Sequence, residues 1–391
     1  MIKKKVLYNI LCCLILFLSL LSYEIHFYKY YSFLQITILG ICCLLIMIVL
    51  KYDKDINRGI YHMLRKNKII IFMFLFMILN TTISYFGEFS KITSLINVIG
   101  MAIAGITFFS VIPLLDDKYK NIKNNIFKLF HIFCLVLILM GLIIYFKKSF
   151  FGYSTIYGRA ASIYYDSNFL AMILAVNIIM LIYNKDIKKI IKYLMILASF
   201  VLIIFTGSRG SLIGLVISFV LYICIYSKYS FFKKIIIGII TLIFTYVLLN
   251  YLNSINFFRL YQGSNGRSEM ISYSFEMIKK SPIFGYGYSN IGHYLLSNGF
   301  RNVSTHNSFV DYCFAFGVVP TILFVSLIVK SFFNGIKNKS KPEYIVSLTF
   351  MIFNMNTILY NFGGVGISSL IFTLVLGFIS ISTKEIIKYE N

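Results

Sequence analysis

The sequence predicts an all-α, polytopic membrane protein with about twelve transmembrane helices and one large extracytoplasmic loop. Hydrophobic residues make up 59% of the 391-residue chain and charged residues 13%, whereas soluble domains carry roughly 25% charge. Long uncharged apolar runs recur along the whole length, as membrane-spanning helices require. A single long polar interval, at 250–307, separates two of these runs. We therefore expect one integral membrane domain over 1–391, with an extracytoplasmic loop at 251–306 inside it.

The apolar runs define the candidate spans, several of which are close to the lower limit of about 17 residues. The first run follows three lysines and resembles a signal peptide, but no small-residue cleavage site follows it, so we interpret it as a retained first helix. The predicted spans are 6–22, 33–50, 68–86, 93–114, 128–146, 166–183, 190–206, 210–227, 235–250, 307–330, 344–360 and 364–382.

The basic residues sort by side of the membrane. With the N-terminus in the cytoplasm, 26 of the 37 lysines and arginines fall in the inside loops and 11 fall outside. This bias predicts an even number of spans with both termini cytoplasmic. It also accounts for the net charge of +23, so nucleic acid is not an expected partner. Trp is absent while Ile, Lys, Asn, Tyr and Phe are abundant, which suggests an AT-rich bacterial genome and hence the cytoplasmic membrane of a bacterium. The seven cysteines lie in or beside apolar runs, and we interpret them as packing residues.

This orientation puts the loop at 251–306 outside the membrane, where no nucleotide pool exists. The Gly285-Tyr286-Gly287 sequence also lacks a preceding strand, so it is not a dinucleotide-binding fingerprint. The loop holds Arg259, Arg267, Lys279, Lys280 and Arg301. An amphipathic helix is predicted at 267–280, ended by Pro282, and we expect it to lie on the outer membrane surface. The residues on its apolar face are Met270, Ile271, Ser274, Met277 and Ile278.

Three outward arginines are candidates for binding a phosphate group. Arg209 lies in the Gly207-Ser208-Arg209-Gly210 turn between two spans, and Arg267 begins the amphipathic helix. Arg159 precedes Asp166-Ser167-Asn168, which has the pattern of a helix N-cap. Arginine suits bidentate phosphate recognition, so the three could hold a lipid diphosphate. The alternative is that each one reaches lipid phosphates without specificity.

His306-Asn307 opens the span at 307–330 and is the candidate catalytic pair. A histidine with a pKa near about 6.5 can act as a general base at neutral pH. The alternative is an interfacial N-cap pair. Asp311 follows on the same helix face as Asn307, one turn inside the membrane, and joins Asn168 and Ser208 as a second-tier candidate. His293 is not distinguished by its surroundings, and His26, His62 and His131 are interpreted as structural.

Outside carboxylates are few and form no Asp-x-Asp pair. A divalent-metal transferase of sugar nucleotides is therefore not expected, and neither a metal nor a cofactor is predicted.

These motifs, in this order, resemble the O-antigen ligase and polymerase family of bacterial membrane glycosyltransferases. The resemblance covers roughly 155–320, and the first five spans match only in hydropathy. The motifs that carry it are Arg159 with Asp166-Ser167-Asn168-Phe169-Leu170-Ala171, then Gly207-Ser208-Arg209-Gly210, then Arg267, then Pro282-Ile283-Phe284-Gly285-Tyr286-Gly287-Tyr288-Ser289-Asn290, then His306-Asn307-Ser308-Phe309.

The resemblance implies metal-independent transfer of a glycan from an undecaprenyl-diphosphate carrier at the outer membrane face. Arg159, Arg209 and Arg267 would hold the diphosphate, His306 would activate the acceptor hydroxyl and Asn307 would orient it. It also implies a flippase and a chain-length regulator as protein partners, besides membrane lipid.

The sequence leaves three functions open, of which the first is the leading prediction and the other two are alternatives. The first is a polymerase that joins lipid-linked repeat units into a capsule, exopolysaccharide or O-antigen. The second is a ligase that moves finished glycan onto lipid A-core, teichoic acid or protein. The third is a transporter or flippase of lipid-linked sugars, which predicts charged residues deep in several helices, whereas here the charges cluster at one face. The sugar, its linkage, the acceptor and the oligomeric state are not determined by these residues.

Overall fold

The computed structural model describes residues 2–22, 24, 26, 30–84, 91–254, 266–300, 303–338 and 340–381. Arg259 and Arg301, two of the expected loop residues, lie outside the described residues. The described elements are α1 (Ile2–Leu21), α2 (Tyr31–Tyr52), α3 (Lys54–Lys66), α4 (Lys68–Ile83), α5 (Lys91–Ile106), the π-helix η2 (Thr107–Val111), α6 (Ile112–Tyr119), α7 (Ile122–Lys147), β1 (Ser149–Phe150), β2 (Tyr153–Ser154), α8 (Ser167–Tyr183), α9 (Lys189–Thr206), α10 (Arg209–Tyr226), α11 (Phe231–Ser254), α12 (Arg267–Lys280), the 3-10 helix η4 (Tyr288–Asn290), α13 (Ile291–Ser297), α14 (Ser308–Phe316), α15 (Val318–Lys337), α16 (Pro342–Asn354) and α17 (Ile367–Ile381).

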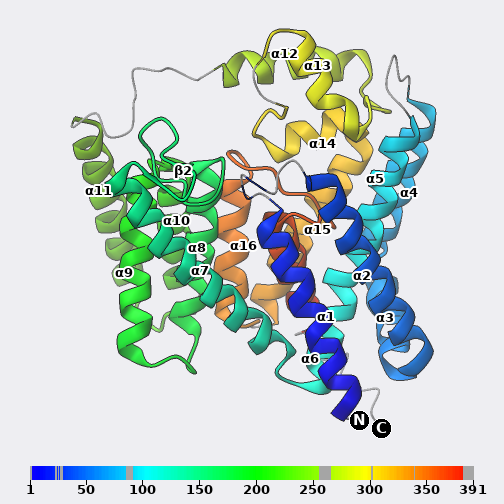
Figure 1. Cartoon of the computed structure of the whole chain (residues 1–391), viewed down its shortest axis with the longest axis horizontal. Helices are drawn as coiled ribbons and strands as arrows, with labels where there is room; N and C mark the ends of the chain where they lie inside the picture. The colour runs from blue at the N-terminus through cyan, green and yellow to red at the C-terminus, as the bar shows by residue number, and fades with distance from the viewer. Residues whose placement is uncertain are drawn as a thin grey trace.

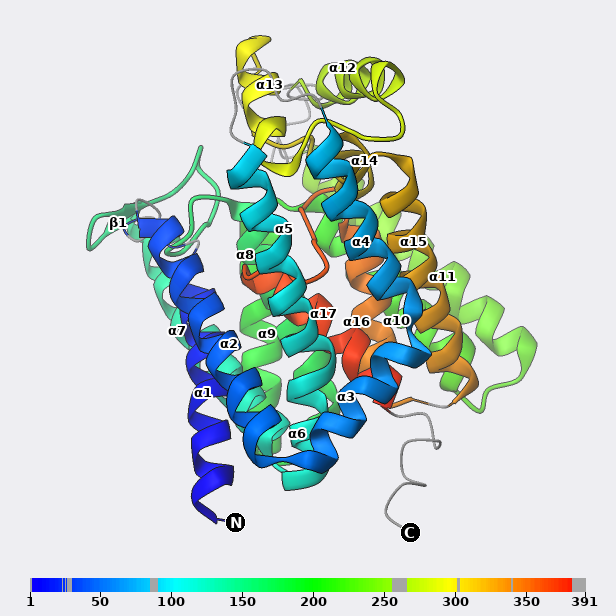
Figure 2. The ribbon, with the colours of Figure 1, turned by 90° about the vertical axis from the view of Figure 1, so that its right-hand side faces the viewer.

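Long apolar helices run between the two ends of the molecule, which confirms the all-α membrane class. Helix α1 begins at one end, while α12, α13 and α14 lie together at the other (Figures 1 and 2). Within the described ranges, seven helices are long and apolar enough to cross a membrane, and eight if the α3–α4 pair, bent by 76°, is one span. Helices α8 and α17 are apolar but shorter. The described part of the chain therefore has fewer full-length spans than the twelve predicted.

Two predicted spans are wrong in their bounds. The span predicted at 307–330 is two helices, α14 and α15, because the backbone turns at Gly317, whose φ is +79°. The span predicted at 344–360 ends at Asn354, six residues early, and continues as a turn-rich connection to α17. Asp311 consequently lies on α14, outside the candidate spans, and not one turn inside a membrane helix.

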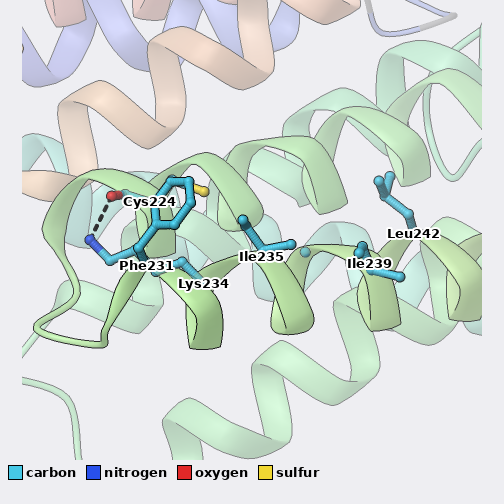
Figure 3. Close-up of a pocket in the computed structure, with 7 residues that line it drawn as sticks. Cys224, Phe231, Lys234, Ile235, Ile239 and Leu242 are labelled. Atoms are coloured by element: carbon cyan, nitrogen blue, oxygen red, sulfur yellow. Dashed lines mark hydrogen bonds between the residues drawn. The ribbon is translucent and has the colours of Figure 1, made fainter.

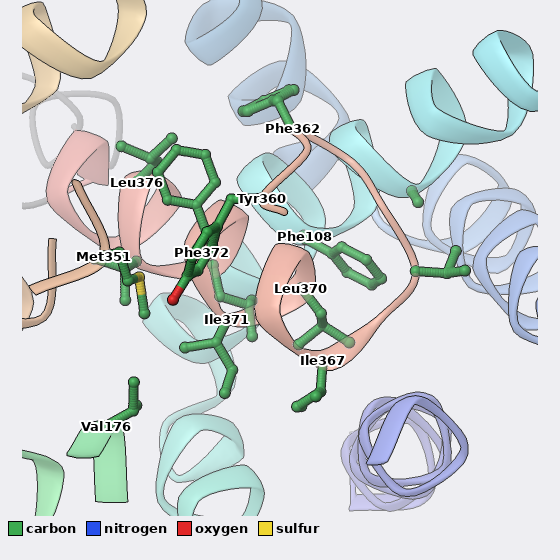
Figure 4. Packing of buried hydrophobic residues seen from close by; sticks show 14 of the residues in the cluster. Phe108, Val176, Met351, Tyr360, Phe362, Ile367, Leu370, Ile371, Phe372 and Leu376 are labelled. Atoms are coloured by element: carbon green, nitrogen blue, oxygen red, sulfur yellow. The ribbon is translucent and has the colours of Figure 1, made fainter. Parts of the chain in front are cut away.

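Helix α17 forms the centre of the core. It is apolar on all sides, and nearly every residue in it is buried, as expected of a helix without a solvent or lipid face. Its aromatic and aliphatic side chains pack with Phe108, Met351 and Tyr360 from three other segments (Figure 4). A Cβ on Gly377 would come within 2.4 Å of the Phe109 backbone oxygen, so α17 packs directly against the π-helix η2. This packing holds the preceding connection, residues 355–366, inside the bundle (Figure 2).

An apolar cavity of about 440 Å³ lies between α10 and α11 (Figure 3). Lys234 Nζ donates a 2.8 Å hydrogen bond to the Cys224 backbone oxygen at its rim. Cys224 and Arg209 are separated by roughly 20 Å along α10, at about 1.5 Å per residue. The cavity is therefore distant from the polar residues singled out in the sequence. The other lining residues are Phe231, Ile235, Gly238, Ile239 and Leu242.

Candidate functional site

The turn between α9 and α10 is as tight as the sequence predicts. Gly207 ends α9 with φ +63°, Ser208 is the N-cap residue of α10, and Arg209 is the first residue of that helix. Ser208 makes no side-chain cap hydrogen bond, whereas the N-cap side chains of α8 and α14 both do. The start of α10 therefore presents backbone N–H groups and the positive end of a helix dipole, with Arg209 as its first residue, and such a helix start suits an anion.

The glycines of this turn have structural roles. Gly207 takes the left-handed conformation that ends α9. A Cβ on Gly210 would lie 2.8 Å from Thr357 Cγ2, so the missing side chain makes room for the connection that follows α16.

Arg159 lies against this turn and against the start of α8. Its Nε donates to the Thr206 backbone oxygen, and its Nη2 donates to Asn168 Oδ1 at 2.9 Å. The Ala160 N–H donates to the Phe205 oxygen at 3.0 Å, which fixes the loop on the end of α9. Asp166 is the N-cap residue of α8 and accepts from the Asn168 N–H at 2.8 Å, as the sequence predicts. Arg159 is thus held on Thr206, three residues before Arg209 in the chain.

Helix α12 has the bounds that the sequence predicts. It begins at Arg267 after Gly266, whose φ is +74°, and ends at Lys280. Its buried residues are Met270, Ser274 and Met277, and the helix packs against α14. The packing brings Arg267, at the first position of α12, toward the residues that precede α14. The place of this helix on the outer membrane surface stays a prediction.

The segment before α14 carries His306 in a conformation that a residue with a Cβ seldom adopts. Its φ is +58°, in the left-handed region, and the surrounding hydrogen bonds maintain it. Asp311, 2% exposed, accepts from Ser304 Oγ at 2.6 Å and from the Thr305 N–H at 3.0 Å. Ser304 Oγ in turn accepts from the His306 N–H at 3.0 Å. Asp311 is therefore the group that shapes the histidine turn.

Asn307 is occupied by structural contacts. Its Oδ1 accepts from the Phe309 and Val310 N–H groups, both at 3.1 Å, which makes it the N-cap of α14. Its Nδ2 donates to Asn356 Oδ1 at 3.2 Å.

The Pro282–Gly287 segment supports α14 from its other end. The Tyr286 and Gly287 N–H groups each donate at 2.8 Å to the Phe314 and Ala315 oxygens, two of the last carbonyls of α14. Gly285 has φ +66°, and a Cβ there would lie 2.6 Å from the Ala315 oxygen. The Gly-Tyr-Gly-Tyr sequence is thus a backbone clasp on α14, and its glycines serve close packing.

A polar segment that the sequence analysis included in a span completes the site. Residues 354–361, between α16 and α17, contact both α10 and α14. Asn354 Nδ2 donates to Ser211 Oγ at 3.2 Å, and the Thr357 backbone carbonyl accepts from the His306 imidazole. The signal was present in the sequence, because Asn354, Asn356, Thr357 and Asn361 interrupt an otherwise apolar C-terminal region.

The charges of the site act on one another. Burial lowers the pKa of His306 below its ordinary value, and the Arg267 guanidinium lowers it further, while Asp166 and the Thr357 carbonyl raise it. Burial also lowers the pKa of Arg267, which Asp166 partly offsets. Burial raises the pKa of Asp311 against the opposing hydrogen bonds from Ser304 and Thr305. Asp166 is therefore within electrostatic reach of both Arg267 and His306, although the sequence indicated it only as a helix cap.

The other histidines lie apart from this set of contacts. His131 Nδ1 pairs with Asn177 Oδ1 at 2.8 Å between α7 and α8, and His26 packs on the Tyr153 ring. His293 is on α13 beside Tyr294. In the parts of the chain that the structure describes, no three His, Cys, Asp or Glu side chains are grouped to hold a metal ion.

The arrangement brings the start of α10, the positions of three arginines and the half-buried His306 to one end of the molecule. Hydrogen bonds and electrostatic contacts link Arg159, Thr206, the α10 start, residues 354–361, His306, Arg267 and Asp166 in one continuous set. Such a site can stabilise negative charge on a leaving group and remove a proton from an attacking one.

Comparison with known proteins agrees with this description. Residues 194–325 match the model of the O-antigen ligase family. A curated relative from Pseudomonas aeruginosa, named O-antigen ligase, is 27% identical over 160 residues. That alignment covers 39% of this chain and 37% of the relative, so the chain spans well under half of that protein's length in the match.

Proposed function

We propose that this chain is a polysaccharide polymerase, and the match of residues 194–325 to the O-antigen ligase family model supports the proposal. It would join undecaprenyl-diphosphate-linked oligosaccharide repeat units into a capsule, exopolysaccharide or O-antigen at the outer face of the cytoplasmic membrane. The observations that support the proposal are the hydrogen bonds that hold Arg159 on the end of α9, three residues before Arg209, and the electrostatic effect of Arg267 on His306.

The mechanism is a single displacement. An acceptor hydroxyl oxygen attacks the anomeric carbon of the donor sugar, and the bond from that carbon to the diphosphate oxygen breaks. The bonding electron pair leaves with the diphosphate, whose charge Arg159, Arg209 and Arg267 stabilise. The hydroxyl proton passes to the ring nitrogen of His306 that does not face the Thr357 carbonyl. One displacement inverts the configuration at the anomeric carbon.

The second candidate is a ligase, and the name of the Pseudomonas aeruginosa relative favours it. A ligase would use the same arginines and the same base, with lipid A-core, teichoic acid or protein as the acceptor. The two functions differ in what accumulates when the site is lost, because a polymerase leaves single repeat units on the carrier and a ligase leaves finished polymer there.

We also propose that both termini are cytoplasmic, because the basic loops then lie inside and the site lies outside. A flippase that delivers the carrier-linked unit and a chain-length regulator are the proposed partner proteins.

The test is complementation of a strain deleted for this protein with wild type, His306→Ala or Arg209→Ala. Membrane expression of each variant is checked by immunoblot, and carrier-linked and free glycans are separated by size. Single repeat units on the carrier in both variants support the polymerase. Full-length polymer on the carrier supports the ligase. Normal glycan in both expressed variants would overturn the site and favour a transporter of lipid-linked sugars.

A further inference from the structure

Residues 354–361 hold the start of α10 through one buried amide. Asn354 is fully buried at the last position of α16, and its Nδ2 donates to Ser211 Oγ at 3.2 Å. Ser211 Oγ also pairs with Ser208 Oγ at 3.1 Å, so the amide reaches the N-cap residue that precedes Arg209. The Asn354 Oδ1 accepts from the Thr357 hydroxyl, which binds the amide to the following turn.

The same segment holds α14 and the histidine on its other side. The Ser308 N–H donates to the Met355 oxygen at 2.8 Å, and Ser308 Oγ donates to the Ile358 oxygen at 3.0 Å. The Thr357 N–H already donates to the Asn354 oxygen at 2.9 Å, which orients the Thr357 carbonyl that accepts from the His306 imidazole. That contact determines which ring nitrogen of His306 is left to take a proton.

We propose that Asn354 is a positioning residue that sets the Arg209 turn and the His306 imidazole relative to each other. An amide can donate to Ser211 and accept from Thr357 at the same time, which neither an apolar side chain nor an ionised carboxylate can do. In the low-dielectric interior both bonds are strong, and losing either leaves a buried polar group without its partner. The proposal rests on the proposed function, because it concerns the geometry of that reaction.

The same buried chemistry elsewhere in the chain provides a matched control. Asn177 on α8 is also fully buried, and its amide bridges His131 on α7 and Ser199 on α9 at 2.8 and 3.4 Å, two contacts that involve no residue of the proposed site. Asn177→Ala therefore reports the cost of deleting a buried, bonded amide without touching the site. The charged groups that act on His306 and must stay constant are Arg267 on α12 and Asp166 before α8. Arg209 on α10 and Asp311 on α14 are the charged residues of the neighbouring elements, and they are left unchanged in every variant.

The experiment measures transfer by the purified full-length protein, with carrier-linked oligosaccharide extracted from the deletion strain as donor. Wild type, Asn354→Ala, Asn177→Ala and His306→Ala are compared over a pH series, with thermal unfolding in detergent recorded for each. For Asn354→Ala we expect kcat to fall by about 10-fold to 100-fold with KM changed less than about threefold, as for a small misplacement of reacting groups. The acid limb of its pH profile should move to lower pH, because the Thr357 carbonyl no longer raises the pKa of His306 as fully.

A double variant keeps the result interpretable if Asn354→Ala is also less stable. Ser211→Ala removes the other end of the bond, so Asn354→Ala with Ser211→Ala should lower kcat no more than the larger single effect. Equal effects of Asn354→Ala and Asn177→Ala, with the pH profile unmoved and His306→Ala inactive, would overturn this inference alone. Full activity of His306→Ala would instead overturn the proposed function.

Discussion

At the scale of single residues, His306 combines two features that work against stability, a left-handed backbone and a buried imidazole. Each one raises the free energy of the folded state, and a chain selected for stability alone would place a glycine there. Asp311 and Ser304 maintain the turn through hydrogen bonds of 2.6 and 3.0 Å. The residue types of the site were predictable from sequence, because arginine, histidine and glycine stand out in a hydrophobic chain. Asn354 was not, because its importance comes from partners far away in the sequence.

Replacing His306 by glycine should remove the base while relieving the backbone. Glycine adopts φ +58° without strain. The free energy of unfolding of His306→Gly should therefore exceed that of wild type by about 1 kcal/mol. Its transfer activity should be lost and then partly restored by added imidazole, measured as released polyprenyl diphosphate. His306→Ala tests the contribution of the backbone, since it has the same missing base and keeps the strain. No recovery with imidazole at any concentration would contradict the general-base role.

Removing the Arg267 charge should move the pH dependence of transfer. The neutral imidazole is the active form, so the rate rises as pH increases through the His306 pKa, which lies below about 6.5 in the folded protein. Arg267 lowers that pKa, so Arg267→Gln should shift the acid limb to higher pH. Lys279→Gln, an exposed change at the other end of α12, should leave the limb in place. An unmoved limb in an active Arg267→Gln variant would contradict the assignment of His306 as the titrating group.

At the scale of elements, the structure shows which sequence patterns predict helix bounds well. Helix α12 and the α9–α10 turn match the prediction because caps, a proline and glycines mark their ends. The span predicted at 344–360 failed because Ile358 and Leu359 continue the apolar pattern beyond Asn354, and hydropathy does not register the backbone partners of Ser308. The division of 307–330 was missed for a similar reason, since Gly317 is one small residue within an apolar run.

Gly317 and Gly299 allow a matched test of the clasp on α14. Both have φ near +80°, but a Cβ on Gly317 would lie 1.9 Å from the Ile283 oxygen, whereas Gly299 has nothing within 4 Å. Gly299→Ala should cost about 1 kcal/mol of unfolding free energy from backbone strain alone. Gly317→Ala should cost at least about 3 kcal/mol, because the clasp must open as well. The test is the shift in the thermal unfolding midpoint of each variant, measured in the same detergent. Equal shifts for the two variants would contradict the close packing at Gly317.

At the scale of the whole molecule, the polar site and the amphipathic helix lie at one end and the first residues of α1 lie at the other (Figure 1). The all-α membrane class followed directly from composition, because the protein must satisfy its backbone hydrogen bonds internally in lipid. The span count did not, because α8, α16 and α17 are shorter than a usual crossing and α17 is enclosed by protein. The mean hydropathy of a segment does not distinguish a helix buried in protein from a helix exposed to lipid.

The proposed orientation predicts which positions are reachable from outside the cell. In a cysteine-free background, Ser297→Cys on α13 should react with a membrane-impermeant maleimide in intact cells. Asn57→Cys, an equally exposed position on α3 at the opposite end, should react only after lysis. Labelling of Asn57→Cys in intact cells, with Ser297→Cys protected, would show that the orientation is the opposite of the one proposed.

The position of residues 354–361 so late in the chain has a consequence for biogenesis. Arg159, Arg209, Arg267 and His306 are all synthesised before α16, yet the bonds from Asn354 to Ser211 and from the Thr357 carbonyl to His306 form only after α16 exists. A nascent protein that has inserted its arginines and its histidine therefore has the reactive groups without their alignment. If the proposed site is correct, it is aligned only after α16 has been synthesised and packed, and a chain that stops before α16 does not hold it.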